Sequence, residues 1–130
     1  MLIQDTTTRK LQVVLKAAVA TTELACVASW RETGTGVFTP GPTLINTNGT
    51  TPVDVSPAPG ASNYKGVDFL NVFNTDSVSA EVTLRYNDNG TIYPIAKAIL
   101  APGERLEFIE GSGIRTFDSS GALKTVQTAA

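Results

Sequence analysis

The sequence contains no histidine and a single cysteine, Cys26, among its 130 residues. Without histidine the chain lacks the usual general base near neutral pH, the Ser–His and Cys–His nucleophile pairs, and imidazole ligands for a metal ion. A zinc site is therefore nearly excluded, and one cysteine cannot form an internal disulfide. Cys26 stands in the apolar run LACVASW, where a buried small hydrophobic residue is the simplest interpretation. A reactive thiol or an intermolecular bridge is the alternative.

Charge of either sign is sparse and evenly spread. The chain has 10 Lys and Arg residues against 12 Asp and Glu residues, a formal net charge of −2. No basic cluster can displace counterions from phosphates or bind an anionic membrane surface, so the sequence predicts neither a nucleic-acid partner nor a membrane partner. No apolar run is long enough to cross a bilayer, and Lys16 and Glu23 interrupt the one segment that resembles a secretion signal. We therefore expect a protein that folds in a cytoplasm.

Threonine is abundant, with 18 residues, and like Val and Ile it favours strands over helices. Alternation of apolar and polar residues predicts half-buried strands in KLQVVLK, LACVASWR, AEVTLRYN and GERLEFIE. The side chains expected to face the core in these segments are Leu11, Val13, Leu15, Leu24, Cys26, Ala28, Trp30, Val82, Leu84, Tyr86, Leu106 and Phe108.

Turn signals rich in Gly, Pro, Asn and Asp recur at intervals of roughly ten residues. This spacing predicts an all-β fold, a single antiparallel β-sandwich domain over residues 1–130, of the jelly-roll or immunoglobulin-like type. Residues 34–62 are the richest in Pro, Gly, Thr and Asn, and we expect long loops there with one or two short strands. The terminal segments 1–9 and 125–130 are expected to be extended arms that order on assembly.

The most polar stretch of the chain is RYNDNGTIYP, residues 85–94. A calcium loop would place oxygen ligands at alternate positions and a bidentate Glu further on, and this stretch does neither. Asn89 and Gly90 instead suit the positive φ angles of a tight hairpin turn, and Asp88 suits the position before them. The sequence predicts a hairpin turn at Asp88, Asn89 and Gly90.

No set of residues predicts catalysis. Glu104, Glu107 and Glu110 are close in sequence, but on a strand Glu107 would face away from the other two. A glycosidase needs two carboxyl groups facing each other across about 5–10 Å. The sequence therefore predicts no catalytic residue, no metal and no cofactor. The aromatic residues with polar tips are expected to pack in the core or at strand edges, with a sugar-stacking platform as the alternative. They are Trp30, Tyr64, Tyr86 and Tyr93.

One segment, YKGVDFLNVFN, is apolar on both faces of the expected strand. Strict alternation places Val67, Phe69 and Phe73 on one face, with Leu70 and Val72 on the other. Such a strand is either covered on both sides or meets another subunit. We therefore predict a homo-oligomer with Val67, Phe69 and Phe73 as candidate interface residues.

The two segments that carry a family resemblance most specifically are NVFNTDSVSAEVTLRYNDNGT and LAPGERLEF, the latter continuing to FDSSGALK. From about Thr6 to Lys124 the chain resembles a family of small proteins encoded among the structural genes of tailed bacteriophages and prophages. These segments are structural, and no catalytic motif belongs to the family pattern, so no catalytic residue is carried over.

The resemblance implies a non-enzymatic protein of the virion, folded in the host bacterial cytoplasm. Its expected partners are other virion proteins of the capsid, neck or tail, to which it would bind as an oligomeric accessory protein. Decoration or cement of the capsid, a place in the neck, and fibre attachment all agree with this expectation. The alternative is a carbohydrate-binding β-sandwich module of a tail or fibre.

Overall fold

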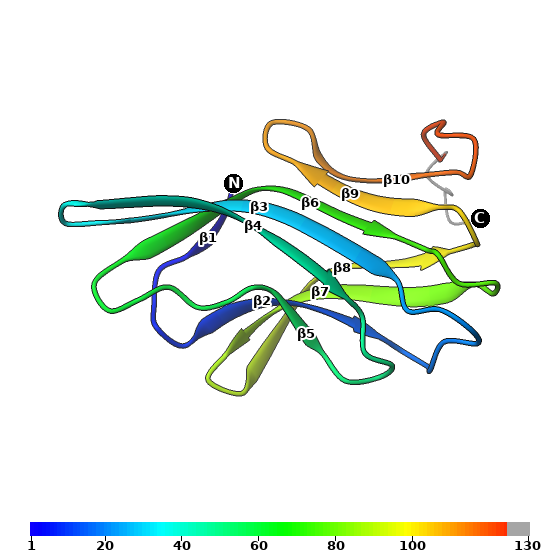
Figure 1. The fold of residues 1–130 in the computed structure, drawn as a ribbon, viewed down its shortest axis with the longest axis horizontal. Coiled ribbons are helices and arrows are strands. Elements are labelled where there is room, and N and C mark those ends of the chain that lie inside the picture. Colours follow the sequence, from blue (N-terminus) through cyan, green and yellow to red (C-terminus); the bar gives the residue numbers. More distant parts are fainter. Residues whose placement is uncertain (125–130) are drawn as a thin grey trace.

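A computed structural model describes residues 1–124, and within that range the chain is all-β, with ten strands and no helix (Figure 1). The strands are β1 (Leu2–Gln4), β2 (Arg9–Leu15), β3 (Ala25–Gly34), β4 (Val37–Asn46), β5 (Val53–Ser56), β6 (Tyr64–Phe73), β7 (Ala80–Asp88), β8 (Thr91–Leu100), β9 (Arg105–Ile109) and β10 (Gly113–Phe117). The described part of the chain accordingly holds no helix with the length and apolarity that crossing a membrane requires.

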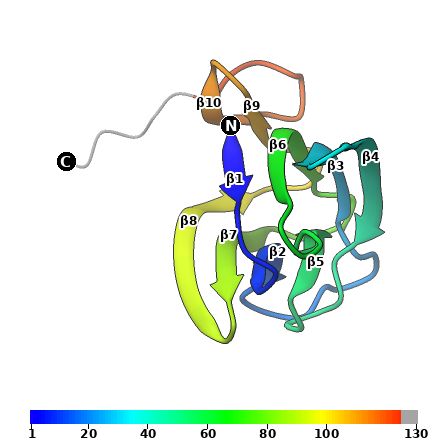
Figure 2. The same cartoon turned by 90° about the vertical axis from the view of Figure 1, so that its left-hand side faces the viewer.

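The strands form two antiparallel sheets that pack as the layers of a sandwich. The six-stranded sheet has the order β10-β9-β6-β3-β4, and β1 pairs with β6 next to β9. The four-stranded sheet has the order β5-β2-β7-β8. Figure 2 shows the two layers, with β9, β6, β3 and β4 in one and β8, β7, β2 and β5 in the other. The predicted all-β, antiparallel sandwich is confirmed.

The core lies between the sheets and is built from the alternating residues of the four predicted strands. The side chains of Leu11, Val13 and Leu15 are at most 3% exposed. The inward positions of β3, β7 and β9 are buried in the same cluster, and Trp30 and Tyr86 pack against it half-buried. Full burial of each Leu or Val stabilises the fold by about 1.5–3 kcal/mol, and β5, β6 and β8 add Val53, Val55, Val67, Leu70, Val72 and Leu100 to the same cluster.

Strand β6 departs from strict alternation. Ser29 pairs with Phe69 but Trp30 pairs with Val67, so Asp68 is an extra residue in the ladder. Such a β-bulge changes which residues share a face. Val67 lies in the core together with Leu70 and Val72, and the prediction that it shares a face with Phe69 and Phe73 is wrong.

The stretch 34–62 contains more regular structure than its composition predicts. Strand β4 runs for ten residues and forms with β3 a long hairpin that projects from the body of the molecule (Figure 1). Pro40 and Pro42 are tolerated because β4 is an edge strand. Residues two apart on a strand direct their backbone nitrogens to the same side. The nitrogens of both prolines therefore face the open edge, where no N–H donor is needed. The stretch thus holds two strands, β4 and β5, as expected, but β4 is not short.

The N-terminal residues 1–9 are not a free arm in this structure. Strand β1 pairs with β6 through Leu2–Val67 and Gln4–Lys65, and the side chain of Gln4 is fully buried. Sequence composition cannot reveal this, because a three-residue strand gains its stability from the partner that it docks on. The second predicted arm, residues 125–130, lies outside the described residues.

Asn89 and Gly90 form the two-residue connection between β7 and β8, with φ angles of 52° and 94°. Asp88 pairs with Thr91 across the end of the hairpin. The Asp88 carboxylate accepts hydrogen bonds from the hydroxyl of Thr8 (2.6 Å) and the guanidinium of Arg9 (3.0 Å). Those bonds lower the pKa of Asp88 and attach the start of β2 to the turn.

Replacement of Gly90 by Val is expected to lower the free energy of unfolding by about 1–2 kcal/mol, because a β-branched residue resists a positive φ angle. No atom lies within 4 Å of where a Cβ would stand, so the cost is conformational rather than steric crowding. Urea denaturation measures the change. The control is Thr91→Val, which places the same Val side chain at an extended position of the same hairpin. Equal stability of the two variants would contradict a left-handed Gly90.

Candidate interaction surface

The outer face of the four-stranded sheet is mainly polar, although Ile92 and Ile99 of β8 are exposed on it. Gln12 points away from the core, yet is only 5% exposed because charged side chains cover it. Its Nε2 donates to Asp54 Oδ1 (2.8 Å), and its Oε1 accepts from Arg85 Nε (3.3 Å). A hydrogen-bonded network of this kind is suited to face water.

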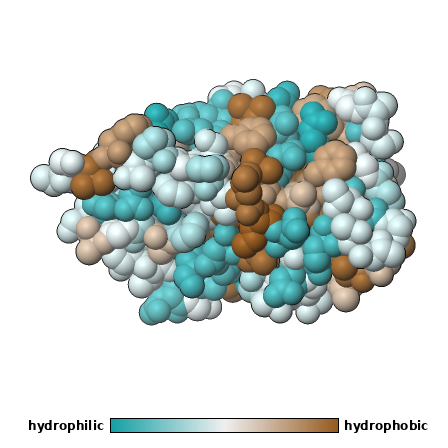
Figure 3. Space-filling view, in the orientation of Figure 1, coloured by the Kyte–Doolittle hydropathy of each residue, from teal (hydrophilic) through white to brown (hydrophobic). Residues whose placement is uncertain are grey.

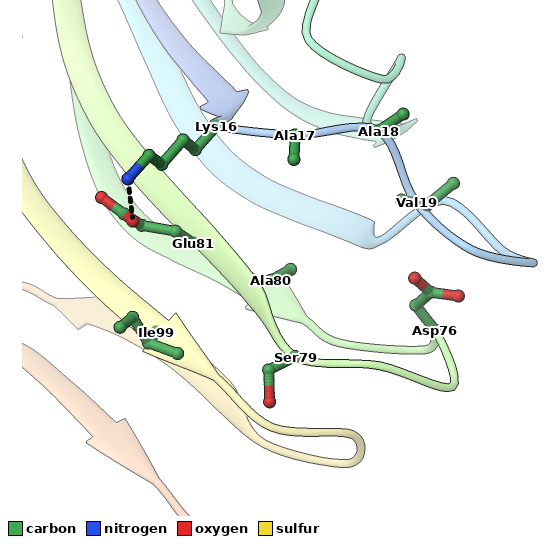
Figure 4. Close-up of a pocket in the computed structure, with 9 residues that line it drawn as sticks. All are labelled: Lys16, Ala17, Ala18, Val19, Asp76, Ser79, Ala80, Glu81 and Ile99. Atoms are coloured by element: carbon green, nitrogen blue, oxygen red, sulfur yellow. Dashed lines mark ion pairs between the residues drawn. The ribbon is translucent and has the colours of Figure 1, made fainter.

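A depression beside this sheet is lined by Lys16, Ala17, Ala18, Val19, Asp76, Ser79, Ala80, Glu81 and Ile99 (Figure 4). Its charged groups are already engaged. Glu81 pairs with Lys16 at 3.5 Å and with Lys97 at 3.3 Å. Asp76 accepts backbone hydrogen bonds from the loop that follows β2. With a volume of about 250 Å³, the depression is smaller than the ~300–1,000 Å³ of typical ligand pockets.

The outer face of the six-stranded sheet is different. Its exposed or half-buried residues with apolar side chains are Ile3, Val27, Phe38, Pro40, Pro42, Leu44, Tyr64, Phe69 and Phe73, and we call this set the apolar face. Leu44 is 74% exposed and Phe38 64% exposed, although both lie on strand β4. On the side seen in Figure 3, hydrophobic residues gather at the tip of the β3–β4 hairpin and in a strip across the middle of the molecule.

Strand register brings the residues of the apolar face onto neighbouring strands, with Ser29, Arg31 and Asn71 between them. Leu44 pairs with Val27, and Ser29 lies between Pro42 and Phe69 on the two neighbouring strands. Directly opposed residues of an antiparallel pair have Cβ atoms about 4.5–5.5 Å apart, so Leu44 and Val27 are neighbours, whereas the Ser29 strand position separates Pro42 from Phe69. Of the three predicted interface residues, Phe69 and Phe73 lie on this face and Val67 does not.

Ion pairs lie at two places on the outer face of the six-stranded sheet, and we call their six side chains the charged border. Arg31 stands on β3 between Pro40 and Gly66, among the residues of the apolar face, and lies 3.0 Å from Asp68 and 3.7 Å from Glu110. At the second place Glu107 lies 3.5 Å from Arg105 and 3.9 Å from Arg115. These three acidic and three basic side chains balance, so the border carries no net charge.

The hairpin end of the apolar face is hollowed. Thr33 pairs with Phe38 on one side and with Tyr64 on the other, so the two aromatic side chains flank it. Met1, Arg31 and Gly66 complete the lining of a depression of about 260 Å³.

The sequence did not indicate Phe38 or Leu44, because the prolines between them are typical of loops. The apolar pairs Val37–Phe38 and Leu44–Ile45 are the only local signal of a strand.

The Trp and Tyr residues do not form one platform. Trp30 is half-buried and donates from Nε1 to Thr43 Oγ1 (3.0 Å), while the ammonium of Lys65 lies 4.1 Å from the centre of its ring. Tyr86 packs against the core. Tyr64 and Tyr93 are exposed but belong to β6 and β8, which lie in different sheets.

The three glutamates considered as catalytic candidates have separate structural partners. Glu104 accepts from the backbone N–H of Ala101 (2.8 Å) and from Lys124 Nζ (2.9 Å). The Lys124 ammonium is the main cause that lowers the pKa of Glu104, the opposite of what a general acid requires. Glu107 and Glu110 belong to the two ion-pair groups described above, so the structure does not bring the three carboxylates together.

Cys26 is buried in the core, and burial raises the pKa of its thiol to about 12. A thiol with that pKa stays protonated near neutral pH and does not act as a nucleophile. Within residues 1–124, no three Asp, Glu or Cys side chains gather closely enough to hold a metal ion.

Comparison of the chain with protein-family models, with curated proteins and with solved structures gave no match. The apolar face therefore has to be interpreted from its own geometry and chemistry. Its features are wide exposure, extension over several neighbouring strands and a balanced charged border. All three are typical of a surface for binding another macromolecule rather than a small molecule.

Proposed function

We propose that this chain is a non-enzymatic structural protein of a tailed-bacteriophage particle, an oligomeric accessory protein that binds other virion proteins of the capsid, neck or tail. The observation that carries the structural part is the apolar face, with Leu44 and Phe38 exposed on a long strand. Large apolar side chains gathered on one exposed face usually mark a surface that binds another molecule. The virion part rests on the sequence resemblance of residues 71–91 and 100–124.

Physical chemistry favours association over catalysis here. The described carboxylates are engaged by cations or backbone N–H groups, and the one thiol is buried and protonated. Neither depression combines an open volume with an unengaged titratable group. The chain presents instead a broad surface built on paired strands, which suits contact with another macromolecule.

Quantitative mass spectrometry of purified phage particles tests the proposal, with the copy number of this protein scaled to that of the major capsid protein. We expect the protein in the particles. A copy number comparable to that of the capsid protein would indicate decoration or cement, and a few copies per particle would indicate the neck, tail or fibre base. Particles that lack the protein would contradict the proposal.

The second candidate is a carbohydrate-binding module, and one observation favours it. Phe38 and Tyr64 expose aromatic side chains on either side of Thr33, with the Arg31 guanidinium at the border of the same depression. Aromatic faces next to polar donors are the usual elements of sugar recognition. This candidate becomes the leading one if the protein is absent from particles.

A further inference from the structure

We propose that the apolar face is a self-association surface, on which two copies of this chain stack their six-stranded sheets face to face around a two-fold axis. The inference deepens the proposed structural role and rests on it, since it names the first partner as a second copy of the same chain. Three features of the structure favour a second copy as the partner: the contrast between the two outer faces, the charge of the border, and the available area.

The two outer faces differ in how many apolar groups they expose. The four-stranded sheet exposes Ile92 and Ile99 of β8 among charged side chains, whereas the six-stranded sheet carries all the residues of the apolar face. Both sheets are antiparallel and cover the same core, so each would be expected to turn polar side chains outward. Most outward side chains of the four-stranded sheet are polar, with Gln12, Asp54 and Arg85 in one network and Glu81 between two lysines. The six-stranded sheet places Leu44, Val27 and Phe69 at the equivalent outward positions.

The charge of the border favours a second copy over a charged partner. In an isologous contact each surface meets itself, so a net charge on the surface would repel its own copy. Here Arg31, Arg105 and Arg115 are matched by Asp68, Glu107 and Glu110 within the same surface. The border is therefore self-compatible, and its side chains can exchange partners across the two-fold axis without leaving an unpaired charge.

Association through the face is also favoured over strand addition at the β4 edge. An added strand would need backbone N–H donors along the open edge of β4. Pro40 and Pro42 have none, and their backbone nitrogens face that edge. Stacked sheets require no such donors, and they pack about 10 Å apart through interdigitating side chains. Leu44 and Val27 are placed to make that kind of contact.

The available area sets the expected strength. Strands β3, β4 and β6 each have ten residues, and β9 and β10 each have five. With about 3.3 Å per residue and about 4.8 Å between strands, the outer side of these five strands, charged border included, covers roughly 600 Å² per copy. A standard interface buries about 800 Å² per partner, so the predicted contact is at the lower end of the range. We expect a dimer that dissociates at low protein concentration.

Sedimentation velocity of the purified full chain, between about 1 and 200 µM, tests the inference. The wild-type protein is expected to shift from monomer to dimer over this range. The variant Leu44→Lys is expected to raise the dissociation constant by about tenfold or more, because each copy would bury an unpaired ammonium. The matched control is Ile99→Lys, at a side chain 63% exposed on the outer face of the other sheet, and it should dimerise as the wild type does. Circular dichroism melting curves establish that both variants are folded.

A wild-type protein that stays monomeric over the whole range overturns the inference. So does a Leu44→Lys variant that dimerises normally, or an Ile99→Lys variant that loses the dimer to the same extent. These outcomes are separable from a failure of the proposed function. A monomer found in purified particles would remove the self-contact and keep the structural role, whereas a dimer that particles lack would keep the contact and remove the virion role.

Discussion

Replacement of Gln4 by Leu is expected to lower the free energy of unfolding by about 3 kcal/mol. The side chain of Gln4 is fully buried at the point where β1 meets the four-stranded sheet. Its Nε2 donates to the backbone oxygens of Arg9 (2.9 Å), Ser56 (2.9 Å) and Pro57 (3.1 Å), and its Oε1 accepts from the Ser56 hydroxyl. A Leu side chain of similar size would leave these groups buried without partners, and each such group costs about 1–3 kcal/mol.

Urea denaturation of Gln4→Leu and of Ile3→Ala measures this effect against a control in the same short strand. Ile3 is exposed, so its truncation should change the free energy of unfolding by less than about 0.5 kcal/mol. If Gln4→Leu proved as stable as the wild-type protein, residues 1–9 would contribute nothing to the fold. They would then behave as the free arm that their composition predicts.

Replacement of Asp76 by Asn is expected to lower the midpoint of thermal unfolding at pH 7 by several degrees. The carboxylate of Asp76 accepts hydrogen bonds from the backbone N–H groups of Ala20 (2.8 Å), Thr21 (2.9 Å) and Thr22 (3.1 Å), and from the Thr21 hydroxyl (2.9 Å). It thereby attaches the loop between β2 and β3 to the loop between β6 and β7 (Figure 4). A neutral amide accepts these bonds more weakly and turns one of its two acceptor oxygens into a donor.

The same variant predicts a change in pH dependence. The backbone N–H groups, led by that of Ala20, hold the pKa of Asp76 well below its usual value of 3.8. A carboxylate with a lowered pKa stabilises the folded state above the unfolded pKa, and this contribution is lost as the pH falls. The wild-type protein should therefore lose stability more steeply than Asp76→Asn between about pH 4 and pH 2.

Thermal melts over that pH range measure the difference between the two proteins, and Asp5→Asn is the control, because the side chain of Asp5 is largely exposed and bonded to Arg9 alone. Other carboxylates with lowered pKa values, such as Asp88 and Glu104, contribute equally to the wild-type protein and to the variant. Only the difference is thus assigned to Asp76. Parallel curves for the wild-type protein and Asp76→Asn would contradict the role given to its charge.

Part of the candidate surface follows from the sequence. The segment YKGVDFLNVFN has more apolar residues than one buried face needs, and Phe69 and Phe73 do face outward. Val67 does not, because the direction of a side chain depends on the number of residues between ladder pairs. The bulge at Asp68 adds one. The position of such a bulge is set by the pairing of β6 with β3, and no local pattern in β6 indicates it.

The sequence by itself determined the features that depend on neighbouring residues. Alternation placed Leu11, Val13 and Leu84 in the core, since successive side chains of any strand point to opposite faces. The dipeptide Asn89-Gly90 placed the hairpin, since these two residues tolerate positive φ angles at the least cost.

Only the tertiary structure decided the features that depend on partners distant in the chain. Strand β4 forms despite Pro40 and Pro42 because it pairs on one side only, and β1 is held because Gln4 reaches Ser56 in the other sheet. The apolar character of one outer face arises from the register that sets Leu44 beside Val27 and Pro42 and Phe69 on either side of Ser29. The contacts that stabilise these features form only once the sheets have paired, so no local stretch of sequence encodes the features.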